Sequence, residues 1–216
     1  MRARALEPAG VALVDKPAGP SSFAIVAAIR RRTGARTGHA GTLDPFATGL
    51  LLVLSGRATK LAPRLVGLDK RYVTTIDLTA TTATGDPEGE TLERHDAPAE
   101  LDLDRLRGEI ELPVPAASAV KIGGERAYKL HRRGVEVTMP MRRSLVHALD
   151  VVDRDATTVT LDLRVSSGTY VRAIAQALGG HCRTLRRLEV GPFSIDEAHP
   201  PEELELLSEE EVLGRL

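Results

Sequence analysis

Apolar and polar positions in this chain of 216 residues alternate over several long segments, with the period of two that strands show. Residues 72–78, 145–152 and 157–165 have this alternation and predict three strands. Apolar runs predict two further, buried strands, one at residues 11–17 that a Lys-Pro turn closes and one at residues 50–54. The segment "RTLRRLEVGPFSI" predicts a last strand near the C-terminus.

Helical patterns are fewer and shorter. The clearest one follows Ser21 and Ser22, either of which can cap a helix that carries three arginines in its last turn and ends at Gly34. The segment 70–95, with "GDPEG" as its turn, predicts a hairpin. Other helices are expected near Thr59, at 101–110, between Thr169 and Gly179, and in an acidic tail from Glu202 onward. Strands in hairpin order with helices at intervals predict an α+β fold with a mixed, mostly antiparallel sheet flanked by helices.

The composition fits a globular protein, because 42% of the residues are apolar. Apolar runs are far shorter than the roughly 18 residues of a membrane span, and the N-terminus lacks the apolar stretch of a secretory signal. A single cysteine, Cys182, cannot form an internal disulfide. We therefore expect a cytoplasmic protein without membrane contact.

Charge is distributed unevenly, although the net charge is only −1. The balance of Lys and Arg over Asp and Glu is +8 in residues 1–72, −8 in 73–112 and +5 in 121–143. Basic segments separated by acidic ones could form one positive face for a polyanion, but solvated surfaces of an ordinary domain are an equally good interpretation.

The candidate chemistry centres on one carboxylate. Asp44 lies in the loop "GHAGTLDPFATG", which has no second acid for an acid–base pair. The chain has no P-loop and no Gly-rich dinucleotide motif, and its six histidines lack metal-ligand spacing. Taken alone, an Asp-Pro step in such a loop is more often a turn former than a catalytic group.

A resemblance that covers roughly residues 11–200 changes this interpretation. The segment "GHAGTLDPFATGLL" resembles the aspartate loop of the TruB family of tRNA pseudouridine synthases, to which dyskerin is related. Four further segments resemble motifs of this family and follow in its order: "VDKPAGPSS", "DKRY", "SSGTYVRAIAQALG" and "LRRLEVGPF". The resemblance implies the pseudouridine synthase fold and an isomerase.

The implied reaction detaches a uridine at its N1–C1′ bond, turns the base over and rejoins it through C5. Nothing is oxidised or hydrolysed, so we expect no cofactor and no metal. Asp44 is expected to be the nucleophile. Attack at C1′, attack at C6 and removal of a sugar proton as a base all remain open.

The family's other active-site residues fall on matching positions. Arg172 is expected to pair with Asp44 and hold it ionised, instead of being a solvated helix arginine. Tyr72, Tyr170 and Leu188 are expected to enclose the flipped base, although each alone would be read as a core residue. Tyr72 is also expected to be catalytic and to help move the C5 proton. His39 is expected to contact the RNA near the flipped nucleotide.

The basic stretch after residue 116 matches the family's RNA-gripping insertion, expected at about 116–143. The implied substrate is the T-loop uridine at position 55 of tRNA, recognised mainly by shape in its T-arm stem-loop. We expect a monomer, as in the family. The candidate phosphate ligands are Lys121, Arg126, Lys129, Arg132, Arg133, Arg142 and Arg143.

Three departures from the family pattern limit the resemblance. Ala117 stands where an aromatic residue is frequent, and Ala83 stands where an aspartate is common. We expect a catalytic domain at 1–200, a short acidic helix at 201–216 and no full copy of the C-terminal RNA-binding PUA domain that bacterial members usually carry. Either this member works without that domain, or the chain is a catalytic fragment. Two alternatives therefore stay open: a pseudouridine synthase for another structured RNA, and a tRNA-folding chaperone with the same fold.

Overall fold

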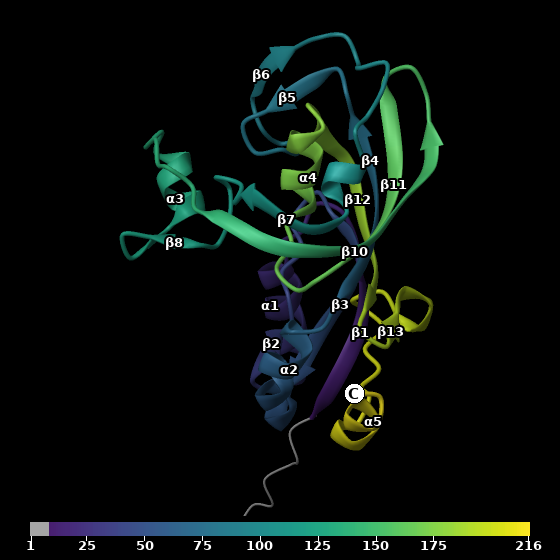
Figure 1. Cartoon of the computed structure of the whole chain (residues 1–216). Coiled ribbons are helices and arrows are strands. Elements are labelled where there is room, and N and C mark those ends of the chain that lie inside the picture. Colours follow the sequence, from purple (N-terminus) through teal and green to yellow (C-terminus); the bar gives the residue numbers. More distant parts are fainter. Residues whose placement is uncertain (1–8) are drawn as a thin grey trace, which may run out of the picture. The chain divides into compact units, whose positions relative to one another are not determined.

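The computed structural model describes residues 9–216, and their contacts divide these residues into two units (Figure 1). The first unit holds residues 9–72 and 186–216, and the second holds residues 73–185. The predicted catalytic domain of residues 1–200 begins in residues 1–8, which lie outside the described residues. Among residues 9–216, no helix is long and apolar enough to cross a membrane.

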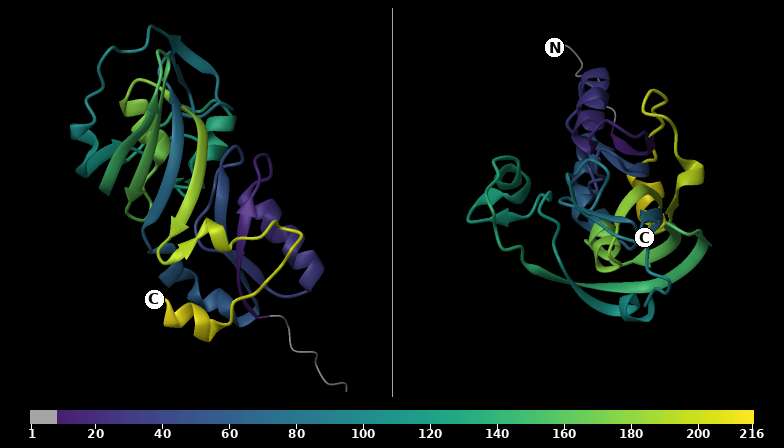
Figure 2. Two further views of the ribbon diagram at one scale, coloured as in Figure 1. Left: turned by 90° about the vertical axis from the view of Figure 1, so that its right-hand side faces the viewer. Right: turned by 90° about the horizontal axis from the view of Figure 1, so that it is seen from above.

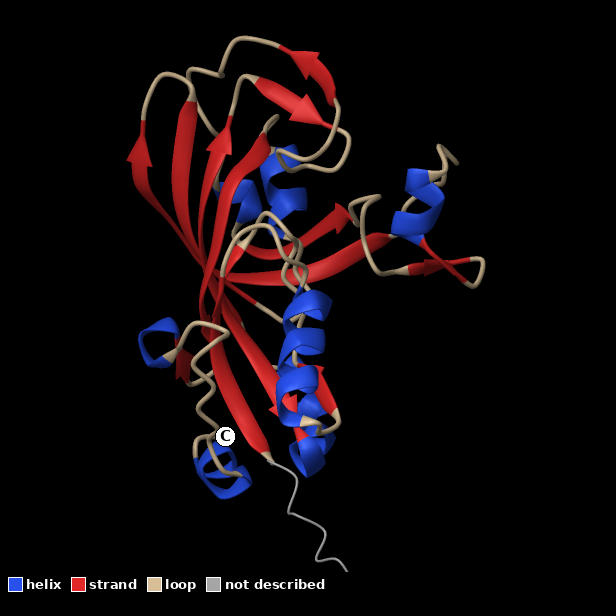
Figure 3. Ribbon diagram, turned by 180° about the vertical axis from the view of Figure 1, so that it is seen from behind, coloured by secondary structure: helices blue, strands red, loops and turns tan. Residues whose placement is uncertain are grey.

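Strands β1, β3 and β12 form the sheet of the first unit, in that order. Strand β1 pairs antiparallel with β3, β12 pairs parallel with β3, and the short β2 pairs with β3 as well. Helix α1 runs beside these strands (Figure 3). The bounds are β1 Gly10–Lys16, α1 Ser22–Thr33, β2 Thr37–His39, β3 Thr48–Ser55 and β12 His181–Val190, the last of which begins in the second unit.

The predicted first helix is confirmed with both of its ends. Ser21 accepts a hydrogen bond from the amide of Ala24, and Gly34 ends the helix in a left-handed conformation. The apolar run of β3 is buried throughout and packs with Val11 and Leu13 of β1 in the core of this unit. The predicted helix near Thr59 is a 3₁₀ turn followed by one short α-helix, with bounds Gly56–Leu61 and, for α2, Ala62–Val66.

The second unit contains the strand order β12-β4-β11-β10-β7, with helix α4 over one face of the sheet (Figure 1). Alternate residues of β4 are buried, as its pattern predicts. The long strand β10 curves strongly and follows directly on the basic excursion, the stretch at about residues 116–143 (Figure 2). The bounds are β4 Lys70–Asp77, which begins in the first unit, β7 Gly108–Pro113, β10 Met141–Arg154, β11 Thr158–Val165 and α4 Val171–Ala177.

The excursion from the sheet has the predicted strand, Gly-Gly turn and basic helix. Strands β8 (Lys121–Ile122) and β9 (Glu125–Arg126) pair across Gly123 and Gly124, both of which have positive φ. Helix α3 (Ala127–Arg132) follows directly.

Three elements differ from the sequence predictions. The hairpin around "GDPEG" joins β5 (Ala80–Thr82) to β6 (Thr91–Arg94) and excludes β4, because the Asp77 carboxylate accepts hydrogen bonds from the amide and hydroxyl of Thr79 and turns the chain there. The helix expected at 101–110 is wrong. Only the 3₁₀ turn Asp104–Leu106 forms before β7, which pairs with β10.

The tail is helical later than expected. Helix α5 spans Glu209–Gly214 and begins at a capping box between Ser208 and Glu211. The residues before it cover the edge of β1, where Leu207 and Val11 exchange backbone hydrogen bonds. Strand β13 (Phe193–Ser194) and the 3₁₀ turn Ile195–Glu197 complete this part of the chain.

Candidate functional site

The loop that carries Asp44 joins β2 to β3 in the first unit. Asp44 is half-buried, and its carbonyl oxygen accepts a hydrogen bond from the amide of Ala47 at 3.2 Å, which closes a four-residue turn around Pro45 and Phe46. The backbone at Asp44 therefore forms the turn that an Asp-Pro step predicts.

A fully buried lysine side chain fixes this turn through hydrogen bonds to its backbone. The ammonium of Lys16, at the end of β1, donates hydrogen bonds to the carbonyl oxygens of Pro17 (2.8 Å), Pro45 (3.1 Å) and Ala47 (2.6 Å). Charge-assisted hydrogen bonds to carbonyls are stronger than neutral ones, and burial strengthens them further. The two residues on either side of Phe46 are thus fixed to β1.

A second polar side chain fixes the other arm of the loop. The hydroxyl of Ser22 is buried, donates to the carbonyl of Leu43 at 2.9 Å and accepts from the amide of the same residue at 2.8 Å. The residue immediately before Asp44 is therefore tied to the first turn of α1. Gly19 adds a backbone hydrogen bond to the carbonyl of Pro45 at 2.8 Å.

Arg187 of β12 is the third anchor, with only 1% of its surface exposed. Its Nε donates to the carbonyl of Leu50 at 2.7 Å and its Nη2 to the carbonyl of Gly41 at 3.1 Å. The backbones of β12 and β3 approach closely here, since a Cβ on Gly49 would lie 2.3 Å from the carbonyl oxygen of Arg187. Gly49 has a φ of 100°, so this approach requires glycine.

Two titratable groups lie close to Arg187. Burial and the Arg187 guanidinium lower the pKa of His39, so its imidazole is neutral at neutral pH. The Nδ1 atom of His39 is buried and has no hydrogen-bond partner among the described residues. Burial and Arg187 also lower the pKa of Lys70 to about 8, against the opposing effect of Asp69. The Lys70 ammonium is held by the carbonyls of Val66 and Leu68.

The other predicted pocket residues are divided between the two units. Tyr72 in β4 is 8% exposed and Leu188 in β12 is half-buried, and both belong to the first unit with Asp44 and His39. Tyr170 and Arg172 belong to the second unit, at the start of α4. Pairing of Arg172 with Asp44 remains a prediction.

Arg172 is buried in a well-defined setting within the second unit. Its Nη1 donates to the carbonyl of Thr84 at 2.6 Å and its Nη2 to the carbonyl of Ala117 at 3.0 Å. Nη1 also lies 3.2 Å from Oδ2 of Asp86, and the side chains of both ionic partners are more than nine-tenths buried. The guanidinium is thereby fixed in position and orientation.

Asp86 is organised by the hairpin turn that sequence alone describes only as "GDPEG". Its carboxylate accepts hydrogen bonds from the Thr84 hydroxyl at 2.6 Å and from the amide of Glu88 at 3.1 Å. Gly85 allows the close approach, because a Cβ there would lie 3.2 Å from the Cβ of Arg172. The turn therefore supplies a buried counter-ion for Arg172.

The basic excursion exposes all seven of its predicted phosphate ligands. Arg132 lies over the ring of Tyr128 at 5.6 Å, and Arg133 pairs with Glu125 at 2.8 Å. Arg143 lies 3.6 Å from the carboxylate of Glu111. The exposed side chains are those of Lys121, Arg126, Lys129, Arg132, Arg133, Arg142 and Arg143.

Comparison with known proteins decides the family. The model of the TruB family pseudouridylate synthase N-terminal domain matches residues 30–171, which is more than half of the chain. The chain belongs to the TruB family of pseudouridylate synthases. The family predicted from the sequence motifs is thereby confirmed.

Relatives and solved structures agree with this assignment. A tRNA pseudouridine synthase B from Mycobacterium sp. (strain KMS) is 45% identical over 208 residues, which cover 88% of this chain and 70% of the relative. A chain in the crystal structure of a Cbf5-Nop10-Gar1 complex is 28% identical with a TM-score of 0.64, over 87% of this chain and 50% of that one. A chain in the structure of an H/ACA RNP bound to a substrate RNA containing 2′-deoxyuridine is 26% identical with a TM-score of 0.63, over 87% of this chain and 49% of that one.

Sequence reasoning missed four buried polar residues around the TruB motifs. Lys16, Lys70 and Arg187 lie inside motifs whose other residues carry the resemblance, and the sequence around Asp86 indicates only a turn. A usable signal existed for Lys16, because a lysine that follows an apolar strand and precedes proline can bind the carbonyls of a neighbouring turn. Arg187 and Asp86 have partners that are distant in sequence, Gly41 and Arg172, whereas Lys70 binds carbonyls that precede it closely in the chain.

The buried ion pair between Arg172 and Asp86 gives a stability prediction. Asp86→Asn leaves the guanidinium without this counter-ion, and we expect the free energy of unfolding to fall by about 3 kcal/mol. The matched control Glu125→Gln removes the partner of an exposed arginine and should cost less than about 1 kcal/mol. Urea unfolding of both variants measures the difference, and equal losses would contradict the structural role of Asp86.

Proposed function

We propose that this chain isomerises the T-loop uridine at position 55 of tRNA to pseudouridine. Membership of the TruB family and relatives named tRNA pseudouridine synthase B support the reaction and its tRNA substrate. The observation that carries the proposal is the loop of Asp44, whose backbone is fixed by Lys16, Ser22 and Arg187. A carboxylate on a backbone held in this way is preorganised for attack on a bound nucleotide.

The reaction needs a base that has left its stack, and extrusion of the uridine costs a few kcal/mol. Asp44 acts as the nucleophile while the N1–C1′ bond breaks, and the detached base turns until C5 faces C1′. The new C5–C1′ bond forms, the bond between Asp44 and the nucleotide breaks and releases the carboxylate, the C5 proton is lost and N1 gains a proton. Atoms and electrons therefore balance without a cofactor. The pocket must hold a flat ring and still allow this rotation, a role that suits Tyr72, Tyr170 and Leu188.

Arg172 pairs with Asp44 in this proposal and keeps the carboxylate ionised. A guanidinium has five N–H donors in a planar fork and can bind more than one carboxylate. Asp86 would then act through Arg172 by fixing its plane, in agreement with their separation of 3.2 Å. His39, with its neutral imidazole, contacts the RNA beside the flipped nucleotide instead of carrying a proton.

The same proposal covers the partner and the compartment. The T-arm stem-loop of tRNA is the partner, and the basic excursion grips its phosphates. We take the enzyme to be a monomer that acts in the cytoplasm, where tRNA is modified.

The catalytic assignment is tested with unmodified tRNA transcript. We expect Asp44→Asn to abolish pseudouridine formation at position 55 and to keep tRNA affinity within about twofold, because the amide preserves the size of the side chain but cannot act as a nucleophile. The control is Asp104→Asn, whose carboxylate is almost fully exposed. Mapping of pseudouridine in the transcript is the measurement. A fully active Asp44→Asn protein would refute the assignment, and wild-type modification only at another site or in another RNA would refute the substrate.

The role of the excursion is tested by salt dependence. Arg132→Ala combined with Arg133→Ala should weaken tRNA binding and reduce the slope of log affinity against log salt concentration by roughly one per lost phosphate contact. Arg107→Ala removes an exposed arginine outside the excursion and should leave the slope unchanged. Filter binding at salt concentrations from about 50 to about 300 mM measures both slopes. Equal slopes for the double variant and the wild type would exclude these arginines as phosphate ligands.

A further inference from the structure

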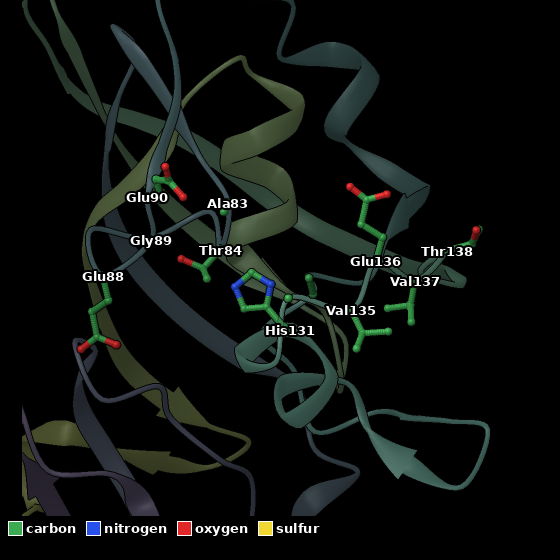
Figure 4. A pocket seen from close by; sticks show the side chains of 12 residues that line it. Ala83, Thr84, Glu88, Gly89, Glu90, His131, Val135, Glu136, Val137 and Thr138 are labelled. Atoms are coloured by element: carbon green, nitrogen blue, oxygen red, sulfur yellow. The ribbon is translucent and has the colours of Figure 1, made fainter.

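The two buried cations that hold the Asp44 loop have almost no surface in contact with solvent. Lys16 at the end of β1 is fully buried, and Arg187 in β12 is 1% exposed. The support of Arg172 in the second unit is different, because Thr84, whose carbonyl binds the guanidinium, lines an open cavity of about 880 Å³ (Figure 4). Any influence from the protein surface on Lys16 and Arg187 therefore passes through the strands that carry them.

An ion pair joins the two residues that directly precede these cations. Asp15 precedes Lys16 in β1, and Arg186 precedes Arg187 in β12. The guanidinium of Arg186 binds the carboxylate of Asp15 with two parallel hydrogen bonds, from Nη1 to Oδ1 at 3.1 Å and from Nη2 to Oδ2 at 2.8 Å. Bidentate pairing of this kind fixes the orientation of both side chains as well as their distance.

The ion pair bridges two strands that a third strand separates. Strand β3 lies between β1 and β12 in the sheet. Asp15 is in register with Leu50 of β3. The parallel pairing of β12 with β3 covers the two residues Arg186 and Arg187, which are in register with Thr48 and Gly49. The ion pair therefore adds a direct link between β1 and β12 at a place where the backbone pairing is short.

The ion pair and the buried cations lie on opposite faces of the sheet. Successive side chains of a strand point to opposite faces, so Asp15 and Arg186 face away from Lys16 and Arg187. The pair is partly accessible, with 37% of the Asp15 side chain and 41% of the Arg186 side chain exposed. An interaction on one face thus sets the separation of two strands whose other face carries both anchors of the Asp44 loop.

We propose that Asp15 and Arg186 are positioning residues for the isomerisation of the uridine. Their ion pair fixes the separation of β1 and β12 across β3, and through it the positions of Lys16 and Arg187 under the two arms of the Asp44 loop. The inference rests on the proposed function, because it concerns the geometry of the same loop. Neither side chain takes part in the chemistry, and each acts through the buried cation that follows it.

Stability and rate respond differently to such a pair. Partly exposed ion pairs add little to the free energy of unfolding. The rate of a reaction that depends on exact placement of a catalytic group is much more sensitive, since a small displacement of that group slows the chemical step. A positioning role is therefore visible in the single-turnover rate at saturating enzyme, which neither tRNA affinity nor overall stability determines.

The test is a double-mutant cycle with Asp15→Asn, Arg186→Gln and the combination of both, assayed on unmodified tRNA transcript. We expect each single variant to form pseudouridine about fivefold more slowly in a single turnover, and the combined variant to be no slower than either, because all three lack the same ion pair. The affinity for tRNA, measured by filter binding, should stay within about twofold of the wild type.

The control is an ion pair of the same unit with similar exposure. Glu197 lies 2.7 Å from Arg215, and 41% and 33% of their side chains are exposed. Glu197→Gln removes this pair near the C-terminus and should leave the single-turnover rate unchanged. Urea unfolding of all variants shows that each one is folded under the conditions of the assay.

The route through Lys16 is tested by adding Asp15→Asn to Lys16→Met. If the ion pair acts by positioning the ammonium, Asp15→Asn should slow the Lys16→Met protein less than about twofold, since the group to be positioned is gone. The same fivefold loss in both backgrounds would contradict this route.

Other results of the cycle would overturn the positioning role. Wild-type single-turnover rates in all three variants, with or without a loss of stability, would show a merely structural ion pair. A loss of tRNA affinity in Arg186→Gln at an unchanged single-turnover rate would show that Arg186 binds RNA phosphate instead. A wild type that forms no pseudouridine in tRNA would refute the proposed function itself, whereas the preceding results refute only the role of the ion pair.

Discussion

The geometry of the Asp44 loop depends on buried cations that bind backbone carbonyls. Lys16 and Arg187 are almost inaccessible to solvent, and between them they donate hydrogen bonds to carbonyl oxygens on both sides of Asp44. A buried charge is costly unless its hydrogen bonds are made, so these side chains and the loop backbone stabilise each other only in one arrangement. The result is a loop rich in small residues that nevertheless has a defined path.

The same principle recurs in the second unit with the charges arranged differently. Arg172 is held by two carbonyls and by the carboxylate of Asp86, which is itself held by the turn "GDPEG". Each unit thus organises its own part of the proposed site before any RNA is bound. Preorganisation of this kind lowers the cost of reaching the transition state, because the groups need not be ordered during the reaction.

The features that were predicted correctly from the sequence are those that local signals or motifs determine. Helix α1 could be placed with both ends because its cap and its glycine stop are local, and the family followed from motifs in order. The prediction of an acidic helix at 101–110 was wrong. The composition of this segment is typical of a helix, but Ile110 and Leu112 belong to β7 and pair with β10. The roles of Arg187 and Asp86 could not be predicted, since each is defined by a partner far away in the sequence.

The most direct test of this account is the single-turnover rate of pseudouridine formation in Lys16→Met, with Lys60→Met, an exposed lysine of the same unit, as control. If the buried ammonium fixes the catalytic loop, Lys16→Met should react at least about tenfold more slowly while its tRNA affinity stays within about twofold. Lys60→Met should react at the wild-type rate. A Lys16→Met protein with the wild-type rate would contradict the claim that the buried cations set the geometry of Asp44.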